Sequence, residues 1–325
     1  MQIGLVGLGK MGASMARKLC RADIHVVGFD ANGKSADGLQ NEPGFNAAYS
    51  LDALLNACNT PRVLWLMLPA GEPTQRVVDE LLCKLTGGDV LVNGANSFYK
   101  TSMVHAEKFR DLGVQFIDAG VSGGIHGLKN GYCIMAGGEA AAIKRIERML
   151  NALSPHPNQW LHCGPSGAGH FVKMVHNGIE YGMMQAYAEG FSLLAAKREL
   201  DLDIGAIAEN WRHGSVVQSW LLDLTAEFLK SDQSLTGIAP SVADSGEGRW
   251  TAIEAIELGI PTPVMSLALM TRFDSQGRDD YAAKLLAMMR KGFGGHGVMS
   301  KVAEDADTAF NHAGFDRENA AAAKK

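Results

Sequence analysis

In the first half of the chain, short apolar runs alternate with segments of helical periodicity. The apolar runs at 2–7, 25–29, 63–68, 90–92, 114–118 and 132–136 predict buried strands. Periodic segments at 13–21, 51–58, 74–85 and 140–151 predict helices between them. This alternation is typical of a doubly wound, mainly parallel α/β sheet.

The pattern changes after residue 151. Residues 152–165 contain three prolines and are interpreted as a boundary. Helical periodicity then dominates, in segments at 166–198, 203–212, 215–230, 249–258, 262–273 and 279–291, before the glycine-rich stretch at 292–297 interrupts it. We therefore divide the chain into an α/β domain at 1–163, an all-α domain at 164–300 and a C-terminal extension at 301–325, which we expect to be partly disordered.

A glycine-rich motif follows the first predicted strand. It reads Gly7-Leu8-Gly9-Lys10-Met11-Gly12 and leads into a helix, and the next strand closes on Asp30. Gly7 permits the tight turn, Gly9 lets the backbone approach a pyrophosphate, and Gly12 lets helix and strand pack closely. The helix N-terminus then favours the phosphate charge. The unit predicts a Rossmann-type dinucleotide-binding domain.

Asp30 bears on the choice of cofactor. A carboxylate at this position accepts hydrogen bonds from the ribose hydroxyls and repels a 2′-phosphate, which favours NAD over NADP. Lys34 could offset part of that repulsion. Three further loops follow predicted strands, at 69–71, 93–97 and 121–124, on the edge where such sheets bind ligands.

The long helix predicted at 166–198 carries an unusual set of polar side chains. Lys173, His176, Asn177, Glu180 and Tyr181 cover roughly 140° of one face. A solvated surface would explain one such residue better than it explains five among apolar neighbours. We interpret this face as a site with acid, base and hydrogen-bonding groups on one rigid element.

Composition excludes several classes of protein. The chain has 325 residues, 46% of them hydrophobic, and a net charge of −5, so it lacks the excess positive charge that is typical of nucleic-acid-binding proteins. Five scattered cysteines, without metal-binding spacing, fit a reducing cytoplasm. We expect no signal peptide, membrane span, membrane partner or metal.

At Lys-Met-Val-His-Asn-Gly-Ile-Glu-Tyr-Gly, residues 173–182, the sequence resembles the decarboxylating 6-phosphogluconate dehydrogenases, and in particular their short, bacterial, NAD-linked branch. The resemblance covers about residues 1–300. The other matching segments are the glycine motif at 7–12, Asn-Gly-Ala-Asn-Ser at 93–97, Val-Ser-Gly-Gly at 121–124, Gly-Arg-Trp-Thr-Ala-Ile at 248–253, and Arg290 with His296.

The resemblance implies oxidation of 6-phosphogluconate at carbon 3, decarboxylation, and protonation of the enol to ribulose 5-phosphate. Lys173 matches the general base and Glu180 matches the acid. The residues expected to bind NAD are Gly7, Leu8, Gly9, Lys10, Met11, Gly12, Asp30, Leu68, Pro69, Ala70 and Asn96. Those expected to bind the substrate are Asn96, Ser122, Gly123, Gly124, His176 and Asn177 at the sugar acid and Tyr181, Arg272, Arg290 and His296 at the phosphate. The family also implies a homodimer or dimer of dimers, in which Arg290 and His296 reach the neighbouring active site.

The chain departs from the family's pattern at the phosphate end. Longer NADP-linked members carry Lys-Gly-Thr-Gly-Lys-Trp where this chain has Ser245-Gly-Glu247-Gly-Arg249-Trp. Glu247 beside a phosphate would be repulsive unless it points away or pairs with Arg249. Those members also carry Asn-Arg-Thr in place of residues 30–32, and the missing arginine supports NAD.

Two other functions compete with this one. A β-hydroxyacid dehydrogenase for a small, non-phosphorylated acid shares the glycine motif, the Ser-Gly-Gly loop and the lysine, but has no need of Glu180. A catalytically silent dinucleotide sensor is the third hypothesis, and it would be expected to lose Lys173. Arg272 and Arg290 favour a substrate with an anionic distal group.

Overall fold

The computed structural model describes residues 1–277 and 280–294. The chain forms two compact units, Met1–Gln276 and Gly277–Lys325. Apart from Gly277, the described part of the second unit is one helix, α13 (Asp280–Gly294). No helix within the described residues is long and apolar enough to cross a membrane.

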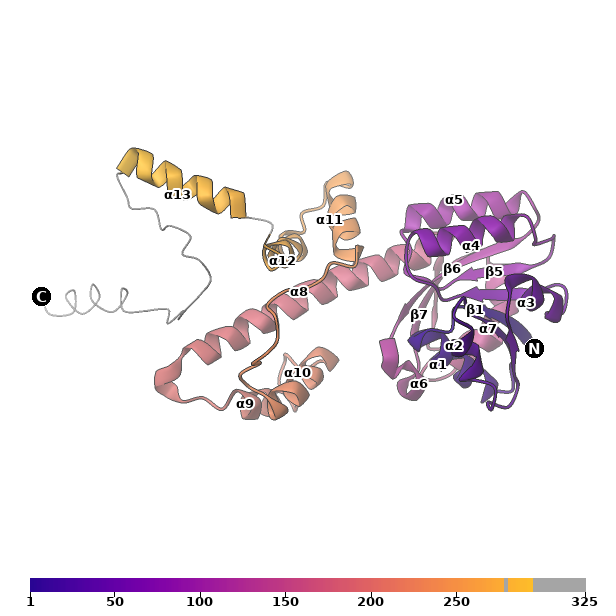
Figure 1. The fold of residues 1–325 in the computed structure, drawn as a ribbon, viewed down its shortest axis with the longest axis horizontal. Coiled ribbons are helices and arrows are strands. Elements are labelled where there is room, and N and C mark those ends of the chain that lie inside the picture. Colours follow the sequence, from indigo (N-terminus) through magenta and orange to yellow (C-terminus); the bar gives the residue numbers. More distant parts are fainter. Residues whose placement is uncertain (278–279, 295–325) are drawn as a thin grey trace, which may run out of the picture. The chain divides into compact units, whose positions relative to one another are not determined.

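One sheet of eight strands forms the centre of the first unit (Figure 1). Its order is β3-β2-β1-β4-β5-β6-β7-β8, and only β6 and β7 pair in antiparallel fashion. The strands are β1 (Gln2–Val6), β2 (His25–Phe29), β3 (Phe45–Ala48), β4 (Val63–Leu66), β5 (Val90–Asn93), β6 (Gln115–Ser122), β7 (Cys133–Gly138) and β8 (Leu161–Gly164). The first six positions have the order of a dinucleotide-binding sheet, so the predicted Rossmann-type fold is confirmed.

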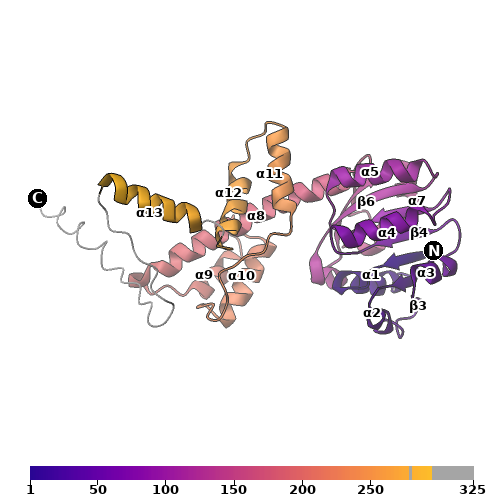
Figure 2. The ribbon, with the colours of Figure 1, turned by 45° about the horizontal axis from the view of Figure 1, so that its top comes forward.

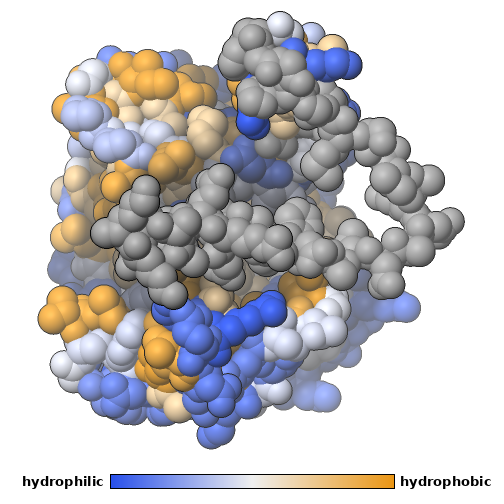
Figure 3. All heavy atoms as spheres, turned by 90° about the vertical axis from the view of Figure 1, so that its left-hand side faces the viewer, coloured by the Kyte–Doolittle hydropathy of each residue, from blue (hydrophilic) through white to orange (hydrophobic). Residues whose placement is uncertain are grey.

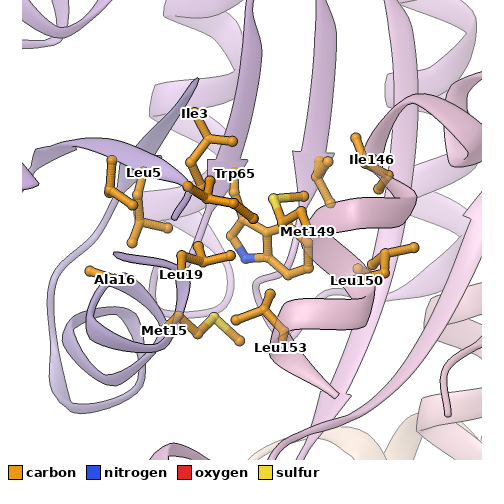
Figure 4. Close-up of a cluster of buried hydrophobic side chains, with 14 of the residues drawn as sticks. Ile3, Leu5, Met15, Ala16, Leu19, Trp65, Ile146, Met149, Leu150 and Leu153 are labelled. Atoms are coloured by element: carbon orange, nitrogen blue, oxygen red, sulfur yellow. The ribbon is translucent and has the colours of Figure 1, made fainter. Parts of the chain in front are cut away.

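Helices cover both faces of the sheet (Figure 2). They are α1 (Lys10–Cys20), α2 (Gly33–Asp37), α3 (Leu51–Ala57), α4 (Glu72–Leu82), α5 (Tyr99–Arg110), α6 (Gly127–Asn130) and α7 (Ala140–Leu153). Helices α1 and α7 bury their apolar sides on one face, where Leu5, Met15, Trp65 and Met149 meet (Figure 4). Helices α3, α4 and α5 cover the other. Both faces are therefore dry, as parallel strands require.

The rest of the first unit is helical, as predicted. It consists of α8 (Ala168–Ala196), α9 (Ile204–Trp211), α10 (Trp220–Ser231), α11 (Glu247–Glu257) and α12 (Pro263–Asp274), with a short 3₁₀ turn at Arg198–Leu200. Another 3₁₀ turn, Gly124–His126, follows β6 in the sheet part. The long helix α8 joins both parts: its start packs on β6 and β7, and its later turns pack on α11 and α12.

Three glycines allow α8 to approach the sheet closely. A Cβ on Gly169 would lie 2.5 Å from the carbonyl oxygens of Asp118 and Met135, and one on Gly137 would lie 2.7 Å from the Gly169 nitrogen. A Cβ on Gly120 would lie 2.3 Å from Cβ of Lys173. Since backbone lies against backbone here, no side chain larger than hydrogen fits without displacing the helix.

Asp118 anchors the first turn of α8. Its carboxylate accepts the N–H groups of Gly167 at 2.6 Å and His170 at 2.8 Å, in place of an N-cap side chain. Burial raises the pKa of the Asp118 carboxyl to about 6, although these N–H donors oppose the rise. Near pH 7 the carboxylate is thus mainly ionised and complements the positive end of the helix.

The structure differs from the sequence prediction in five places. Residues 99–110, for which no element was predicted, form α5, whose inward side carries polar residues: Ser102 bonds His170 and His105 bonds Gln75. Strand β8 lies inside the predicted boundary at 152–165, and β3 was not predicted. Helix α10 begins at Trp220 rather than residue 215, because the Ser219 side chain caps it. Residues 292–294, predicted to break the helical pattern, belong to α13.

The close approach of α8 gives a stability prediction. Gly169→Ala should lower the free energy of unfolding by about 1–3 kcal/mol, since overpacking at backbone contact forces a shift of the helix. Chemical denaturation followed by circular dichroism measures this. Gly38→Ala is the control, because Gly38 has helical dihedral angles and its Cβ would meet only ordinary contacts. Equal stability of the two variants would contradict the close-packing account.

Candidate active site

The glycine motif joins β1 to α1 at the carboxyl edge of the sheet. Gly7 has φ +95°, and a Cβ on Gly12 would lie 1.9 Å from the Gly7 carbonyl oxygen, so both positions require glycine. A Cβ on Gly9 would meet no atom within 4 Å, which leaves the space beside the loop open. Helix α1 begins there without a side-chain cap, so its first N–H groups are available to an anion.

Asp30 lies at the end of β2 and is tied to this loop. Its two carboxylate oxygens accept the N–H groups of Leu8 at 2.7 Å and Asn32 at 2.8 Å. Each oxygen keeps a second lone pair for a further donor. The loop after β4 is fixed in turn, because the Thr74 hydroxyl donates to the Pro69 carbonyl at 2.7 Å. The motif, Asp30 and the 68–70 loop thus end neighbouring strands at one edge.

A cavity of about 800 Å³ lies between this edge and the helices α8 and α10. The residues proposed from the sequence that line it are Met11, Ser122, Gly123, Gly124, Lys173, His176, Asn177 and Glu180. The Cβ of Lys173 lies directly against Gly120 of β6, where a larger residue would leave it no room. Glu180 lies two turns further along α8, on the same cavity.

Lys173 takes part in a buried polar cluster that includes Glu247. Its amine lies 3.1 Å from Asn96 Oδ1 and 3.1 Å from Glu247 Oε1. The same Oε1 accepts the side-chain N–H groups of Asn96 at 2.7 Å and Asn177 at 2.8 Å. Glu247 Oε2 accepts the Ser245 hydroxyl at 2.6 Å. The cluster brings together side chains from the loop after β5, from α8 and from the start of α11.

The pKa values of two buried groups show the electrostatics of this region. Burial alone raises the pKa of Glu247, but the Ser245 hydroxyl and the Lys173 charge outweigh it, so the net shift is downward and the group is a carboxylate. Burial, with the nearby Lys173 charge, lowers the pKa of His170 to about 3. His170 is therefore neutral near pH 7 and bonds Ser102 at 2.7 Å.

The structure decides between the alternatives for Glu247. It does not pair with Arg249, which pairs with Asp244 instead. Only 4% of Glu247 is exposed, and its cationic partner is Lys173. Neither residue type nor spacing reveals this, because it depends on how α11 packs against α8.

Tyr181 and Arg272 form a second group, beyond the residues that line the cavity. The Arg272 guanidinium lies 3.5 Å from the centroid of the Tyr181 ring. The Tyr181 hydroxyl bonds Ser245 at 3.2 Å, which connects this group to Glu247. Arg290 is exposed on α13, whose position relative to this unit is not described, and His296 lies outside the described residues.

The sequence reasoning missed the contribution of α10. Ser219, Trp220, Leu221 and Leu224 line the cavity. The Trp220 ring meets His126 edge to face, with centroids 5.5 Å apart, so α10 and the loop after β6 meet beside the cavity. The signal available in the sequence was a tryptophan, Trp220, directly after a serine that can cap a helix. Among the described residues, no group of three metal-ligating side chains is present.

Two family profiles match the chain. The NAD binding domain of 6-phosphogluconate dehydrogenase matches residues 2–164, and the C-terminal domain of 6-phosphogluconate dehydrogenase matches residues 169–313. A Haloferax volcanii protein named as a decarboxylating, NAD(+)-dependent 6-phosphogluconate dehydrogenase is 37% identical over 93% of this chain and 99% of its own.

Solved structures agree in fold. The Plasmodium falciparum 6-phosphogluconate dehydrogenase superposes with a TM-score of 0.78 at 26% identity, covering 94% of this chain and 67% of its own. A 3-hydroxyisobutyrate dehydrogenase of Mycobacterium tuberculosis reaches a TM-score of 0.67 at 22% identity, covering 86% and 94%, and at that identity it shows the fold alone. The family profiles, which together match most of the chain, decide between these two neighbours: the chain belongs to the 6-phosphogluconate dehydrogenase family.

Proposed function

We propose that this protein oxidises and decarboxylates 6-phosphogluconate to ribulose 5-phosphate and carbon dioxide, with reduction of NAD. The observation that carries the proposal is the placement of Lys173 and Glu180, two turns apart on α8, on one cavity with the Ser122–Gly124 loop. A base and an acid at that separation can reach different carbons of one sugar acid. Family membership and the name of the Haloferax volcanii relative support the same reaction.

The carboxyl edge of the sheet fits a dinucleotide. The open space at Gly9 and the uncapped start of α1 suit the pyrophosphate, and Asp30 keeps acceptor capacity for ribose hydroxyls. Its negative charge disfavours a 2′-phosphate, so NAD is preferred over NADP. When bound, the nicotinamide accepts the hydride from carbon 3.

Lys173 has the role of general base. It removes the proton of the 3-hydroxyl group as the hydride leaves carbon 3, which gives the 3-keto acid. Loss of carbon dioxide then yields the enol, and Glu180 supplies the proton to the carbon that the carboxylate has left. Asn96, Ser122, His176 and Asn177 offer hydrogen-bonding groups for the carboxylate and hydroxyls of the substrate.

The phosphate end is assigned to Tyr181 and Arg272, with Arg290 and His296. The Arg272 guanidinium lies over the Tyr181 ring, and a guanidinium suits bidentate phosphate binding. One carboxylate oxygen of Glu247 contacts Lys173 and the other accepts the Ser245 hydroxyl, so its negative charge beside this end is partly compensated. A non-decarboxylating β-hydroxyacid dehydrogenase is disfavoured, since such a reaction has no enol for Glu180 to protonate and no phosphate for Arg272 to bind.

The protein is proposed to act as a homodimer or dimer of dimers in the cytoplasm. Large apolar side chains are exposed along the helical part, as Figure 3 shows for one face. Examples are Leu193 at 74%, Ile256 at 79%, Val264 at 68% and Leu267 at 65% exposed. Exposed apolar surface on this scale is typical of an interface between subunits. The scattered free cysteines of the described part suit a reducing compartment.

The base assignment is tested by Lys173→Met. This variant should lose about 10²–10⁴-fold in kcat, the usual contribution of general-base catalysis, while NAD binding stays close to that of the wild type. Steady-state kinetics and calorimetric titration with NAD measure the two effects. Lys144→Met, on the exposed side of α7, is the matched control. Retention of more than about a tenth of kcat would reject Lys173 as the base.

The cofactor assignment is tested by Asp30→Asn combined with Ala31→Arg. This pair should narrow or reverse the preference for NAD, because it removes the repulsion and adds a phosphate-binding cation, while the introduced asparagine keeps an acceptor oxygen for the loop N–H. The measurement is the ratio of kcat/KM for NAD and NADP, with Asp52→Asn as the control. An unmoved ratio would show that Asp30 does not lie at the ribose.

The shared active site is tested by complementation. Inactive Lys173→Met and inactive Arg290→Ala protomers, mixed under subunit exchange, should recover about a quarter of wild-type activity, because half of a random mixture is mixed dimers with one intact site each. Mass spectrometry of tagged subunits verifies the exchange. Absence of recovery after exchange would mean that Arg290 serves its own chain.

A further inference from the structure

Glu247 is fixed in place by the contact between α11 and α8. It is the first residue of α11, between Gly246 with φ +104° and Gly248, whose Cβ would lie 2.4 Å from the Tyr181 ring. The Thr251 hydroxyl, one turn later, donates to the Met174 carbonyl at 2.9 Å. These contacts press the start of α11 against the helix that carries Lys173, so Glu247 has little freedom to turn away.

The carboxylate also organises the residues assigned to substrate. Asn96 binds both partners of the ion pair, since its carbonyl oxygen accepts from Lys173 and its amide donates to Glu247. Asn177 donates to the same carboxylate oxygen. One side chain therefore orients the base and two amides before any ligand binds, and the helix N-terminus favours its negative charge.

We propose that Glu247 is a positioning residue that holds Lys173, Asn96 and Asn177 in place in the free enzyme and couples its own charge to that of Lys173. The Glu247 carboxylate lies 3.1 Å from the amine and only 4% of the residue is exposed, so removing its charge removes the ionic partner that the described structure gives Lys173. General-base action requires the amine to lose its proton, so the contact that fixes the geometry of Lys173 also bears on the first chemical step.

No other described carboxylate offers Lys173 a comparable partner. The remaining ionisable groups on the elements packed around it are His170, His176 and Glu180 on α8, Asp118 on β6, and the Tyr99, Lys100 and Glu254 group between α5 and α11. His170 is neutral, with its pKa lowered to about 3 by burial and by Lys173. Asp118 accepts backbone N–H groups, and His176 bonds Asn177 at 3.1 Å.

The test is Glu247→Gln, which keeps size and removes the charge. In the cofactor-free protein, trace acylation of Lys173 with acetic anhydride is followed over a pH series by mass spectrometry. The pH midpoint of acylation should fall by roughly one to three units, the usual effect of removing an adjacent opposite charge. The acid limb of kcat/KM should move to lower pH in the same direction, while kcat at its optimum falls because the base and the two amides lose their anchor.

Glu254→Gln is the matched control, because it makes the same change on the same helix at a buried carboxylate bonded to Tyr99 and Lys100. It should leave both pH midpoints unchanged. If Glu247→Gln does not fold, Glu247→Thr removes the charge with a smaller, uncharged polar side chain. An unchanged acylation midpoint in a folded charge-removing variant overturns the proposal.

The inference rests on the proposed role of Lys173 as the base, and the two measurements separate their failures. A shifted acylation midpoint with an unshifted kcat/KM profile would support the Glu247–Lys173 coupling and reject Lys173 as the base. Acylation and kcat/KM midpoints that both stay at wild-type values would reject the coupling alone, leaving the test with Lys173→Met to decide the base.

Discussion

The close contact between α8 and the β6–β7 pair is the constraint on which the candidate site depends. Gly120, Gly137 and Gly169 let a helix backbone lie against a sheet backbone, and Asp118 fixes the first turn of that helix. Lys173 lies one turn further along α8, so this contact determines its position. Because α8 is continuous from Ala168 to Ala196, the same contact also sets the position of Glu180 and of the surfaces on which α11 and α12 pack.

The second dependence is electrostatic. A buried ion pair costs desolvation free energy, which is offset only when the remaining hydrogen-bonding capacity of both ions is satisfied. Here Asn96, Asn177 and Ser245 supply that satisfaction to Glu247. The amides assigned to substrate binding are thereby also structural. The site is preorganised because its polar groups already hold one another in place.

The sequence predicted the fold well where hydrophobic period and motif agree. The strand–glycine–helix unit, the strand ending at Asp30 and the long α8 all follow from local pattern. Helix α5 escaped prediction because Ser102 and His105 occupy buried positions where an amphipathic helix would have apolar residues. The edge strands β3 and β8 have four residues each, which is too short for a clear hydrophobic pattern.

The sequence indicated which residues belong to the candidate site, but not which of them contact one another. Lys173, His176, Asn177 and Glu180 fall on one face by helical geometry alone, and they line one cavity. Glu247, the ionic partner of Lys173, lies 74 residues further along the chain, and the two residues meet only because α11 packs on α8. The sequence comparison left open whether Glu247 points away from the phosphate or pairs with Arg249, and the packing of α11 directs it toward the Lys173 amine.

The bond from Leu8 N–H to Asp30 has a consequence for how cofactor choice can evolve in this chain. The carboxylate suited to reading the ribose is also the acceptor that stabilises the glycine turn. A lineage that exchanges residue 30 for a small apolar side chain would weaken the loop before acquiring a new cofactor. Asparagine at residue 30 would keep this hydrogen bond, since its amide oxygen can still accept the Leu8 N–H. Few substitutions at this position therefore preserve the turn while the preference changes toward a phosphorylated dinucleotide.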